Sequence, residues 1–197
     1  MAEPARRQAT YDDLLAAPPH CIAQLVDGEL HVQPRPAGPH GVAASGLGMD
    51  LGAPFQRGRG GPGGWIIIDE PQLHFGRDVV VPDLAGWRAD RPPELEAIFF
   101  TVPPAWVCEV LSPRSTVFDR GPKAEVYARA GVEFLWFVEP LANLIEAYQL
   151  RDGVWSRLGA WAGDVSARIP PFDAVELELG PLWVIKNPDI DRPTQDA

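Results

Sequence analysis

The segment DRGPKAEVYARAGVEFLWFVEP, residues 119–140, predicts a helix over residues 120–130 followed by a strand over Phe134–Glu139. Asp119 has a side chain suited to capping this helix, and Gly131 suits the left-handed residue that ends one. Upstream, WVCEVL at residues 106–111 is a short, almost wholly apolar run, which is typical of a central strand. Both strands are therefore expected in the core sheet of the molecule, with the helix packed against it.

The rest of the chain adds several strands and few helices. Thr10 and Asp13 form a capping box before a short helix through Ala17. The pair Asp27-Gly28 favours a two-residue turn in a hairpin. Further elements are a helix over 39–56 and strands over 22–26, 29–32, 65–69, 73–75, 79–81, 84–87, 144–150 and 154–158. Together they predict an α/β (α+β) fold, a central mixed sheet flanked by helices, with an N-terminal helix and hairpin. We expect one domain over 10–186 and disordered tails over 1–9 and 187–197.

The composition excludes several classes of protein. The 197 residues contain no apolar run near the length of about 18 residues that a membrane span needs, and the N-terminus lacks the apolar core of a signal peptide. The two cysteines, Cys21 and Cys108, form no CxxC pair, which excludes a disulfide scaffold and a cysteine-rich zinc site. We therefore expect a cytoplasmic protein. With a net charge of −10, contact with nucleic acid should be local, brief or assisted by a metal ion, since proteins that coat nucleic acid are usually basic.

Three charged residues lie in apolar surroundings, namely Asp83 in VVVPDLAGW, Glu109 in WVCEVL and Lys123 in the predicted helix. Lys123 shares the stripe of Val126 and Tyr127 that should face the sheet. An unpaired buried charge is unfavourable, so the three residues form either a structural salt-bridge network or a site that holds a cation. Mg²⁺ typically binds one or two carboxylates plus water and a substrate phosphate. A neighbouring lysine could then orient the attacking water and stabilise developing negative charge.

Several motifs follow one another in a characteristic order along residues 11–150. They are LVDGEL at 25–30, Pro39-His40, VVVPD ending at Asp83, WVCEVLSP around Glu109, and the segment 119–140 quoted above. In this order they resemble the Uma-two family of restriction endonucleases, within the PD-(D/E)XK nuclease superfamily. The resemblance implies a restriction-endonuclease-like fold and metal-dependent hydrolysis of phosphodiester bonds.

The resemblance also assigns roles to individual residues. Asp83 and Glu109 match the metal ligands, with Mg²⁺ or Mn²⁺ as the cofactor, and Glu70 matches a further acidic position and is a third candidate ligand. The usual lysine of the superfamily, two residues after the glutamate, is replaced here by Leu111. The lysine of this family corresponds instead to Lys123, which we expect to assist water activation and charge stabilisation.

Other positions carry less specific expectations. His40 matches a histidine of the family, which either contacts phosphate, shuttles a proton or is structural. Gln24 stands where the family usually has glutamate; it keeps the oxygen but loses the charge, so metal binding should be weaker if that glutamate helps to hold the ion. Ser112, Arg114 and Arg120 lie near the proposed site in sequence and are candidate phosphate contacts. Core packing is expected for Cys108, on the sheet face opposite Glu109, and for Trp65, Trp87, Trp106 and Trp136.

The sequence favours a Mg²⁺- or Mn²⁺-dependent DNA endonuclease with Asp83, Glu109 and Lys123 as catalytic residues. The expected partner is DNA, and we expect a homodimer because two sites cut two strands most simply; neither a membrane nor an organic cofactor is expected. Two alternatives stay open. One is a catalytically silent module with the same fold that binds DNA or protein, favoured by Gln24 and the negative charge. The other is a structural protein in which the three charged residues form a salt-bridge network.

Overall fold

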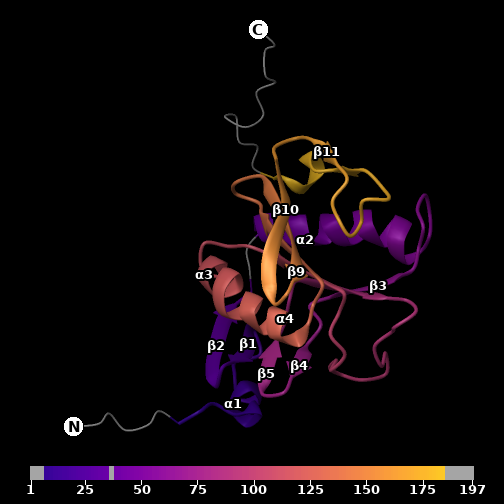
Figure 1. The fold of residues 1–197 in the computed structure, drawn as a ribbon. Coiled ribbons are helices and arrows are strands. Elements are labelled where there is room, and N and C mark those ends of the chain that lie inside the picture. The colour runs from indigo at the N-terminus through magenta and orange to yellow at the C-terminus, as the bar shows by residue number, and fades with distance from the viewer. Residues whose placement is uncertain (1–6, 36–37, 185–197) are drawn as a thin grey trace.

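The computed structural model describes residues 7–35 and 38–184, which form two main sheets and a small third one (Figure 1). The larger sheet has the order β10-β9-β8-β7-β6-β3, and the smaller one has the order β2-β1-β5-β4. The strands of the larger sheet are β3 (Trp65–Asp69), β6 (Leu84–Arg88), β7 (Trp106–Val110), β8 (Phe134–Glu139), β9 (Leu144–Arg151) and β10 (Val154–Ala162). Only β7 and β8 pair in parallel there, and the other neighbours are antiparallel. The expected mixed sheet flanked by helices is thus confirmed.

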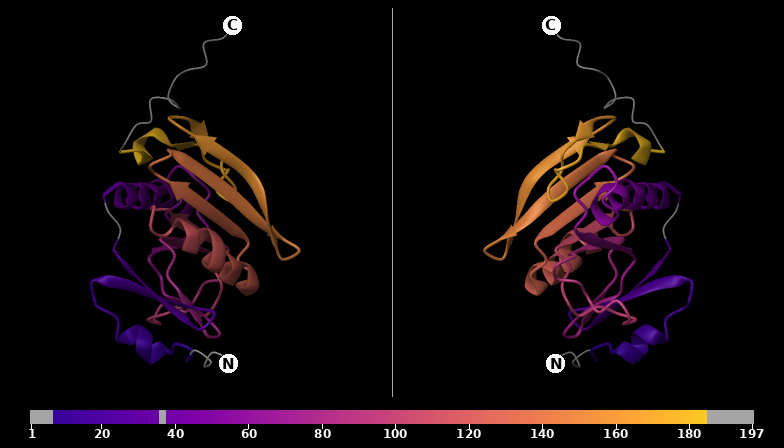
Figure 2. Two further views of the ribbon diagram at one scale, coloured as in Figure 1. Left: turned by 90° about the vertical axis from the view of Figure 1, so that its left-hand side faces the viewer. Right: turned by 90° about the vertical axis from the view of Figure 1, so that its right-hand side faces the viewer.

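The smaller sheet joins the N-terminal hairpin to part of the predicted strand block. It consists of β1 (Cys21–Val26), β2 (Glu29–Pro34), β4 (Leu73–Phe75) and β5 (Asp78–Val80), and β1 reaches β5 through the pair Leu25 and Val79. Figures 1 and 2 show these strands side by side, with α1 (Tyr11–Leu15) beneath them. The chain therefore changes sheet between β5 and β6. This crossing places Asp83, at the start of β6, where the two sheets meet.

The two faces of the larger sheet carry separate cores. One face packs on α2 (Gly38–Leu51), on its π-helical continuation η1 (Gly52–Gln56) and on the C-terminal segment with β11 (Ser166–Ala167), β12 (Leu177–Glu178) and the turn η3 (Gly180–Leu182). The opposite face packs on α3 (Thr116–Phe118), η2 (Asp119–Lys123) and α4 (Ala124–Ala130). Side chains alternate along β7, so Cys108 belongs to the first core and Val107 to the second. Glu109 therefore points toward α4, as expected.

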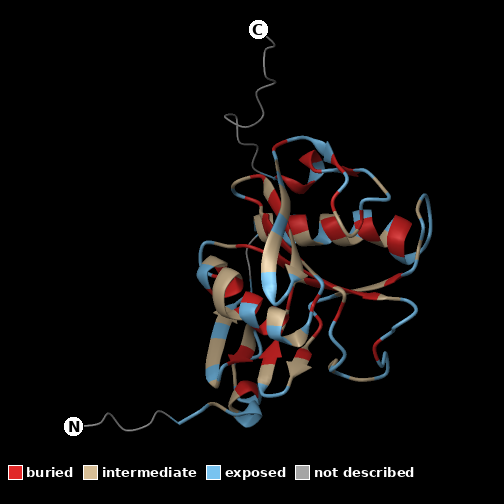
Figure 3. Cartoon of the chain, in the orientation of Figure 1, coloured by how far each residue is buried: buried red, intermediate tan, exposed pale blue. Residues whose placement is uncertain are grey.

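The four tryptophans for which core packing is expected are all core residues. Trp65, Trp87, Trp106 and Trp136 are each at most 4% exposed. Three of them surround Phe172, whose ring centre lies 4.6–5.6 Å from theirs. Figure 3 shows the same pattern at the level of the fold, with buried residues concentrated along the strands and the inner faces of the helices. The expected core packing of these tryptophans is confirmed.

The structure moves several predicted boundaries. Ala9 donates a backbone hydrogen bond to the Gly28 carbonyl at 2.8 Å, and the division into one domain and two tails stays a prediction. The expected tails over 1–6 and 187–197, and the domain end at 185–186, lie outside the described residues. The capping box of Thr10 and Asp13 is confirmed, and Gly131 ends α4 with a φ of 80°. In the part of the chain that the structure describes, no helix is long and apolar enough to cross a membrane.

The largest difference concerns the helix expected over 120–130. It begins earlier, at Thr116, and runs through the π-helical turn η2 before continuing as α4. Asp119 is therefore not the cap at the start of the helix but a buried residue inside it. A π-helical turn holds an additional residue and rotates the side chains that follow it. The turn consequently decides which residues of this segment face the sheet.

Candidate active site

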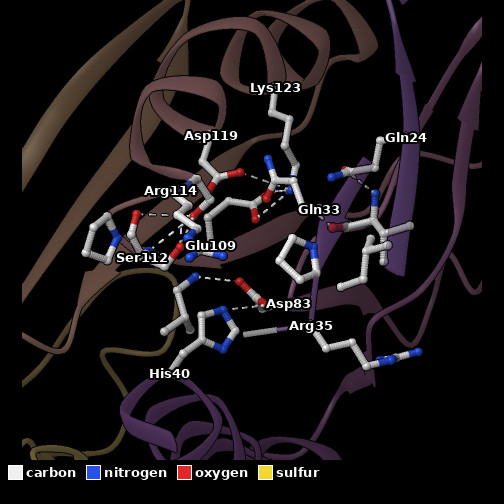
Figure 4. A pocket seen from close by; sticks show the side chains of 16 residues that line it. Gln24, Gln33, Arg35, His40, Asp83, Glu109, Ser112, Arg114, Asp119 and Lys123 are labelled. Atoms are coloured by element: carbon white, nitrogen blue, oxygen red, sulfur yellow. Dashed lines mark hydrogen bonds and ion pairs between the residues drawn. The ribbon is translucent and has the colours of Figure 1, made fainter. Parts of the chain in front are cut away.

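A buried ion pair between Lys123 and Glu109 lies at the centre of the site (Figure 4). The Lys123 Nζ lies 2.8 Å from each Glu109 carboxylate oxygen, and the two side chains are only 3% and 2% exposed. The Tyr127 hydroxyl donates a further hydrogen bond to Glu109 Oε1 at 2.5 Å. Both oxygens of this carboxylate thus have donors, which fixes its orientation and compensates in part for burying its charge.

Asp119 is a member of the site that the sequence reasoning missed. Its Oδ1 lies 3.4 Å from Lys123 Nζ, and its side chain is 6% exposed. The sequence predicts a helix cap at this position because aspartate is one of the preferred capping residues. The overlooked signal is the spacing of Asp119, Lys123 and Tyr127 at intervals of four, which places them on one helix face. The apolar stripe predicts that Tyr127 packs against the sheet, and its hydroxyl also reaches Glu109.

Asp83 connects the ion pair to the N-terminal end of α2. Its Oδ2 accepts a hydrogen bond from the Val110 backbone N–H at 2.7 Å, next to Glu109 on β7. Its Oδ1 lies 3.0 Å from His40 Nε2, and the two side chains are 14% and 11% exposed. The structure therefore brings together Asp83, Glu109, Lys123 and His40, which come from four separate segments.

Gln24 supports the site from β1. Its Oε1 accepts a hydrogen bond from the Val81 backbone N–H at 2.9 Å, and the Lys123 Nζ donates to the carbonyl of the same residue at 3.1 Å. The Val81 residue is thereby held at both of its peptide groups, two residues before Asp83. A glutamate at position 24 could accept the same hydrogen bond and would add a negative charge. The difference from the family pattern therefore changes charge rather than shape.

The local charges shift the protonation of the site. Burial raises the pKa of the Glu109 carboxyl to about 8, and the attraction of Lys123 offsets this only in part. For Lys123, burial acts to lower the pKa, but Glu109, Asp119 and Asp83 together hold it above its ordinary value. Burial next to Glu109 also raises the pKa of the Tyr127 hydroxyl. Lys123 is thus an ammonium at neutral pH, surrounded by three acidic side chains, and Tyr127 is a neutral hydrogen-bond donor.

These groups line a cavity of about 400 Å³ between the N-terminal hairpin and the loop after β7. Figure 4 shows Asp119, Glu109 and Lys123 on one side of it and His40 and Asp83 on another. Ser112 and Arg114 also line it, and the Ser112 hydroxyl lies 3.0 Å from the Ser115 hydroxyl in a turn that shapes the wall. Arg114 has no carboxylate partner among residues 7–35 and 38–184. Its guanidinium is available to an anion at the cavity.

Two of the candidate residues are placed elsewhere. Arg120 is absent from the cavity lining; its guanidinium lies 2.6 Å from Glu146 and 4.7 Å from the ring centre of Phe137. The Glu70 carboxylate accepts a hydrogen bond from Arg35 at 2.9 Å. Glu70 borders a neighbouring pocket that shares Asp83 and His40 with the main cavity. Its side chain is therefore near the site but engaged with a cation of its own.

No group of three His, Cys, Asp or Glu side chains within the described ranges is arranged to hold a metal ion. Besides Asp119, which faces Lys123, the cavity offers a pair of carboxylates, Asp83 directly before β6 and Glu109 on the adjacent strand β7. A pair of this kind suits a cation that takes its remaining ligands from water and substrate. It does not suit a cation that needs a cage made wholly of protein.

Comparisons with known proteins are consistent with this architecture. Among solved structures, the chain is similar to one described as "a putative nuclease belonging to DUF820 from Anabaena variabilis ATCC 29413", with a TM-score of 0.71 and 20% identity over 89% of this chain and 97% of that one. This similarity shows the fold. No curated protein matches the chain significantly. The model of the Uma2 family, described as "Putative restriction endonuclease", matches residues 9–180. Because this match covers most of the chain, the chain belongs to the Uma2 family, as its motifs indicated.

Proposed function

We propose that the chain is an endonuclease that hydrolyses phosphodiester bonds in DNA with Mg²⁺ or Mn²⁺ as its cofactor. The observation that carries this proposal is the convergence of Asp83, Glu109 and Lys123 at one recessed cavity. These residue types are the ones that metal-dependent phosphodiester hydrolysis needs, namely two hard oxygen donors and a compact cation. Membership of a nuclease family supports the reaction class.

The donors at the cavity fit a hard divalent cation that keeps several water ligands. Asp83 and Glu109 would hold it, and water and a substrate phosphate would complete its coordination. Burial, with the nearby Asp119 and Asp83, favours the protonated form of Glu109, and a cation bound at Asp83 and Glu109 would shift Glu109 toward the ionised form that can hold it. We leave Glu70 out of the proposed ligands because its carboxylate pairs with Arg35. When bound, the cation would lower the pKa of a water molecule and withdraw charge from the phosphoryl oxygens.

The protein residues divide the remaining tasks between them. Lys123 fixes the Glu109 carboxylate and supplies positive charge beside the position where negative charge develops on the phosphate. His40 orients the Asp83 carboxylate and lies where it could donate a proton to a leaving oxygen. Arg114 would hold a phosphate oxygen at the cavity wall.

Cleavage of DNA by the purified protein tests this proposal. Supercoiled plasmid and a short branched duplex are incubated at low salt with Mg²⁺, Mn²⁺ or EDTA, using the wild type, Lys123→Met and Glu125→Gln. Glu125 is exposed on α4, so its variant controls for charge changes on the same helix. We expect metal-dependent nicking that Lys123→Met reduces by about a hundredfold or more and that Glu125→Gln retains. Equal cleavage by folded Lys123→Met would overturn the role of Lys123, and no cleavage by the wild type would overturn the proposal.

A catalytically silent module is the second candidate, favoured by a specific observation. Both Glu109 oxygens are already engaged by Lys123 and Tyr127, and Gln24 contributes no charge to the site. A silent module needs no cation, so titration of the metal-free protein with Mn²⁺ in a calorimeter separates the two functions. Saturable binding that Asp83→Asn abolishes supports the endonuclease. The homodimer stays a prediction, which light scattering would check.

A further inference from the structure

The candidate catalytic groups lie at the bottom of the cavity rather than on a projecting surface. The exposed fractions of the side chains are 2% for Glu109, 3% for Lys123, 11% for His40 and 14% for Asp83. Groups buried to this extent cannot move out to meet a phosphate without breaking the ion pair. A reacting phosphate must therefore enter the cavity.

The walls of the cavity limit what can enter. The β1–β2 hairpin contributes Ile22, Gln33 and Pro34 to one wall, and the loop after β7 contributes Pro113 and Arg114 to another. A volume of about 400 Å³ is that of a pocket for a small molecule, which is roughly 300–1,000 Å³. A base-paired duplex is stiff and keeps its bases in the stack, so the sugar and base beside a phosphate cannot follow it into a pocket of this size without local unpairing.

We propose that the scissile phosphate belongs to an unpaired nucleotide, in a single strand or in an unpaired segment of a duplex. This inference rests on the proposed nuclease function and specifies its substrate. The apolar side chains of Ile22, Pro34 and Pro113 would pack against the sugar and base of the nucleotide. The Gln33 amide, which has no hydrogen-bond partner among the described residues, would face the base, and Arg114 would bind an adjacent phosphate.

The net negative charge of the protein also favours an unpaired nucleotide over a duplex as the substrate. Duplex DNA carries one negative charge per about 1.7 Å of helix axis, and proteins gain affinity for it by neutralising many phosphates. A chain with a net charge of −10 gains little in this way. Of the two arginines at the cavity, Arg35 pairs with Glu70, which leaves Arg114 for a phosphate. Affinity must then come largely from contacts inside the cavity, which only an unpaired nucleotide can make.

Binding and cleavage of three matched substrates test this inference. A labelled strand is used alone, fully paired, and paired with a complement that leaves a few central bases mismatched. Fluorescence anisotropy in EDTA should give about tenfold tighter binding of the single strand and the mismatched duplex than of the full duplex. In Mn²⁺, cuts should map to the unpaired nucleotides. Equal binding and cleavage of the full duplex would overturn the inference and leave the nuclease function intact.

Variants of the hairpin wall link the preference to the cavity. Ile22→Trp fills the cavity, whereas Val32→Trp adds the same side chain at an exposed site of the same hairpin. We expect Ile22→Trp to weaken single-strand binding at least fivefold and Val32→Trp to leave it unchanged. If circular dichroism shows that Ile22→Trp is unfolded, Gln33→Ala tests the same wall with no added volume. Selective single-strand binding without cleavage by the wild type would support the cavity as a site for an unpaired nucleotide, and would overturn the nuclease function and with it the scissile phosphate. An equal loss of single-strand affinity in both tryptophan variants would show that the cavity is not the binding site of the unpaired nucleotide.

Discussion

Replacing Glu109 by glutamine isolates the effect of one buried carboxyl on stability. Burial raises the pKa of this group from 4.5 to about 8. Between these values the folded protein retains a proton that the unfolded chain has released, so the stability of the metal-free protein should fall as the pH rises. Glutamine keeps the shape of the side chain and cannot ionise. The Glu109→Gln variant should therefore lose this part of the pH dependence.

The expected size follows from the pKa. A difference of one bound proton changes the free energy of unfolding by about 1.4 kcal/mol per pH unit. From pH 5 to pH 8 the wild type should therefore lose up to about 4 kcal/mol more than the variant. For a chain of this length the Tm falls by roughly 2–4 °C per kcal/mol, so the difference corresponds to about 10 °C. Lys123 contributes nothing in this window because its pKa lies above its ordinary value of 10.5.

Urea unfolding in EDTA at several pH values between 5 and 8 measures the two slopes. Glu125→Gln, which removes an exposed carboxyl from α4, should keep the slope of the wild type. Parallel slopes for the wild type and Glu109→Gln would refute the reasoning. A variant that is strongly destabilised at every pH, with no change of slope, would instead favour a purely structural role for the Lys123–Glu109 pair.

Three further predictions concern the site and the core. Gln24→Glu adds a carboxylate while keeping an acceptor for the Val81 N–H, so calorimetry should show Mn²⁺ binding roughly tenfold tighter; an unchanged Kd would exclude position 24 from the cation site. Gly131→Ala places a Cβ at a φ of 80°, and urea unfolding should show a loss of about 1 kcal/mol. Phe172→Ala removes the ring at the centre of the tryptophan cluster and should cost about 3–5 kcal/mol in the same assay. Losses below about 1 kcal/mol would show that the cluster repacks without it.

The sequence was sufficient wherever a local pattern determines the structure. Alternation along β7 placed Glu109 and Cys108 on opposite faces, because successive side chains of a strand point to opposite sides. The helical stripe placed Lys123 toward the sheet. The Asp27-Gly28 turn could also be predicted from the sequence, since few residue pairs adopt two successive positive φ angles, here 50° and 79°.

The sequence was insufficient where the outcome depends on the phase of a helix or on distant partners. The helix begins at Thr116 without a side-chain cap that would mark its start, so Asp119 lies inside the helix and faces Lys123 instead of capping it. Proximity in sequence also suggested that Arg120 belongs to the site. Its partner Glu146 lies on β9, beyond any local pattern, and directs the guanidinium away from the cavity.

The crossing of the chain from one sheet to the other has a mechanical consequence. The segment from Val81 to Asp83 connects β5 of the smaller sheet to β6 of the larger one, and Gln24 anchors it to the hairpin. Asp83 is therefore attached to both halves of the molecule, whereas Glu109 belongs to the larger sheet alone. A force that levers the hairpin away from β7 would pull Asp83 away from Glu109 at the same time. Opening the cavity and separating Asp83 from Glu109 are thus one and the same movement.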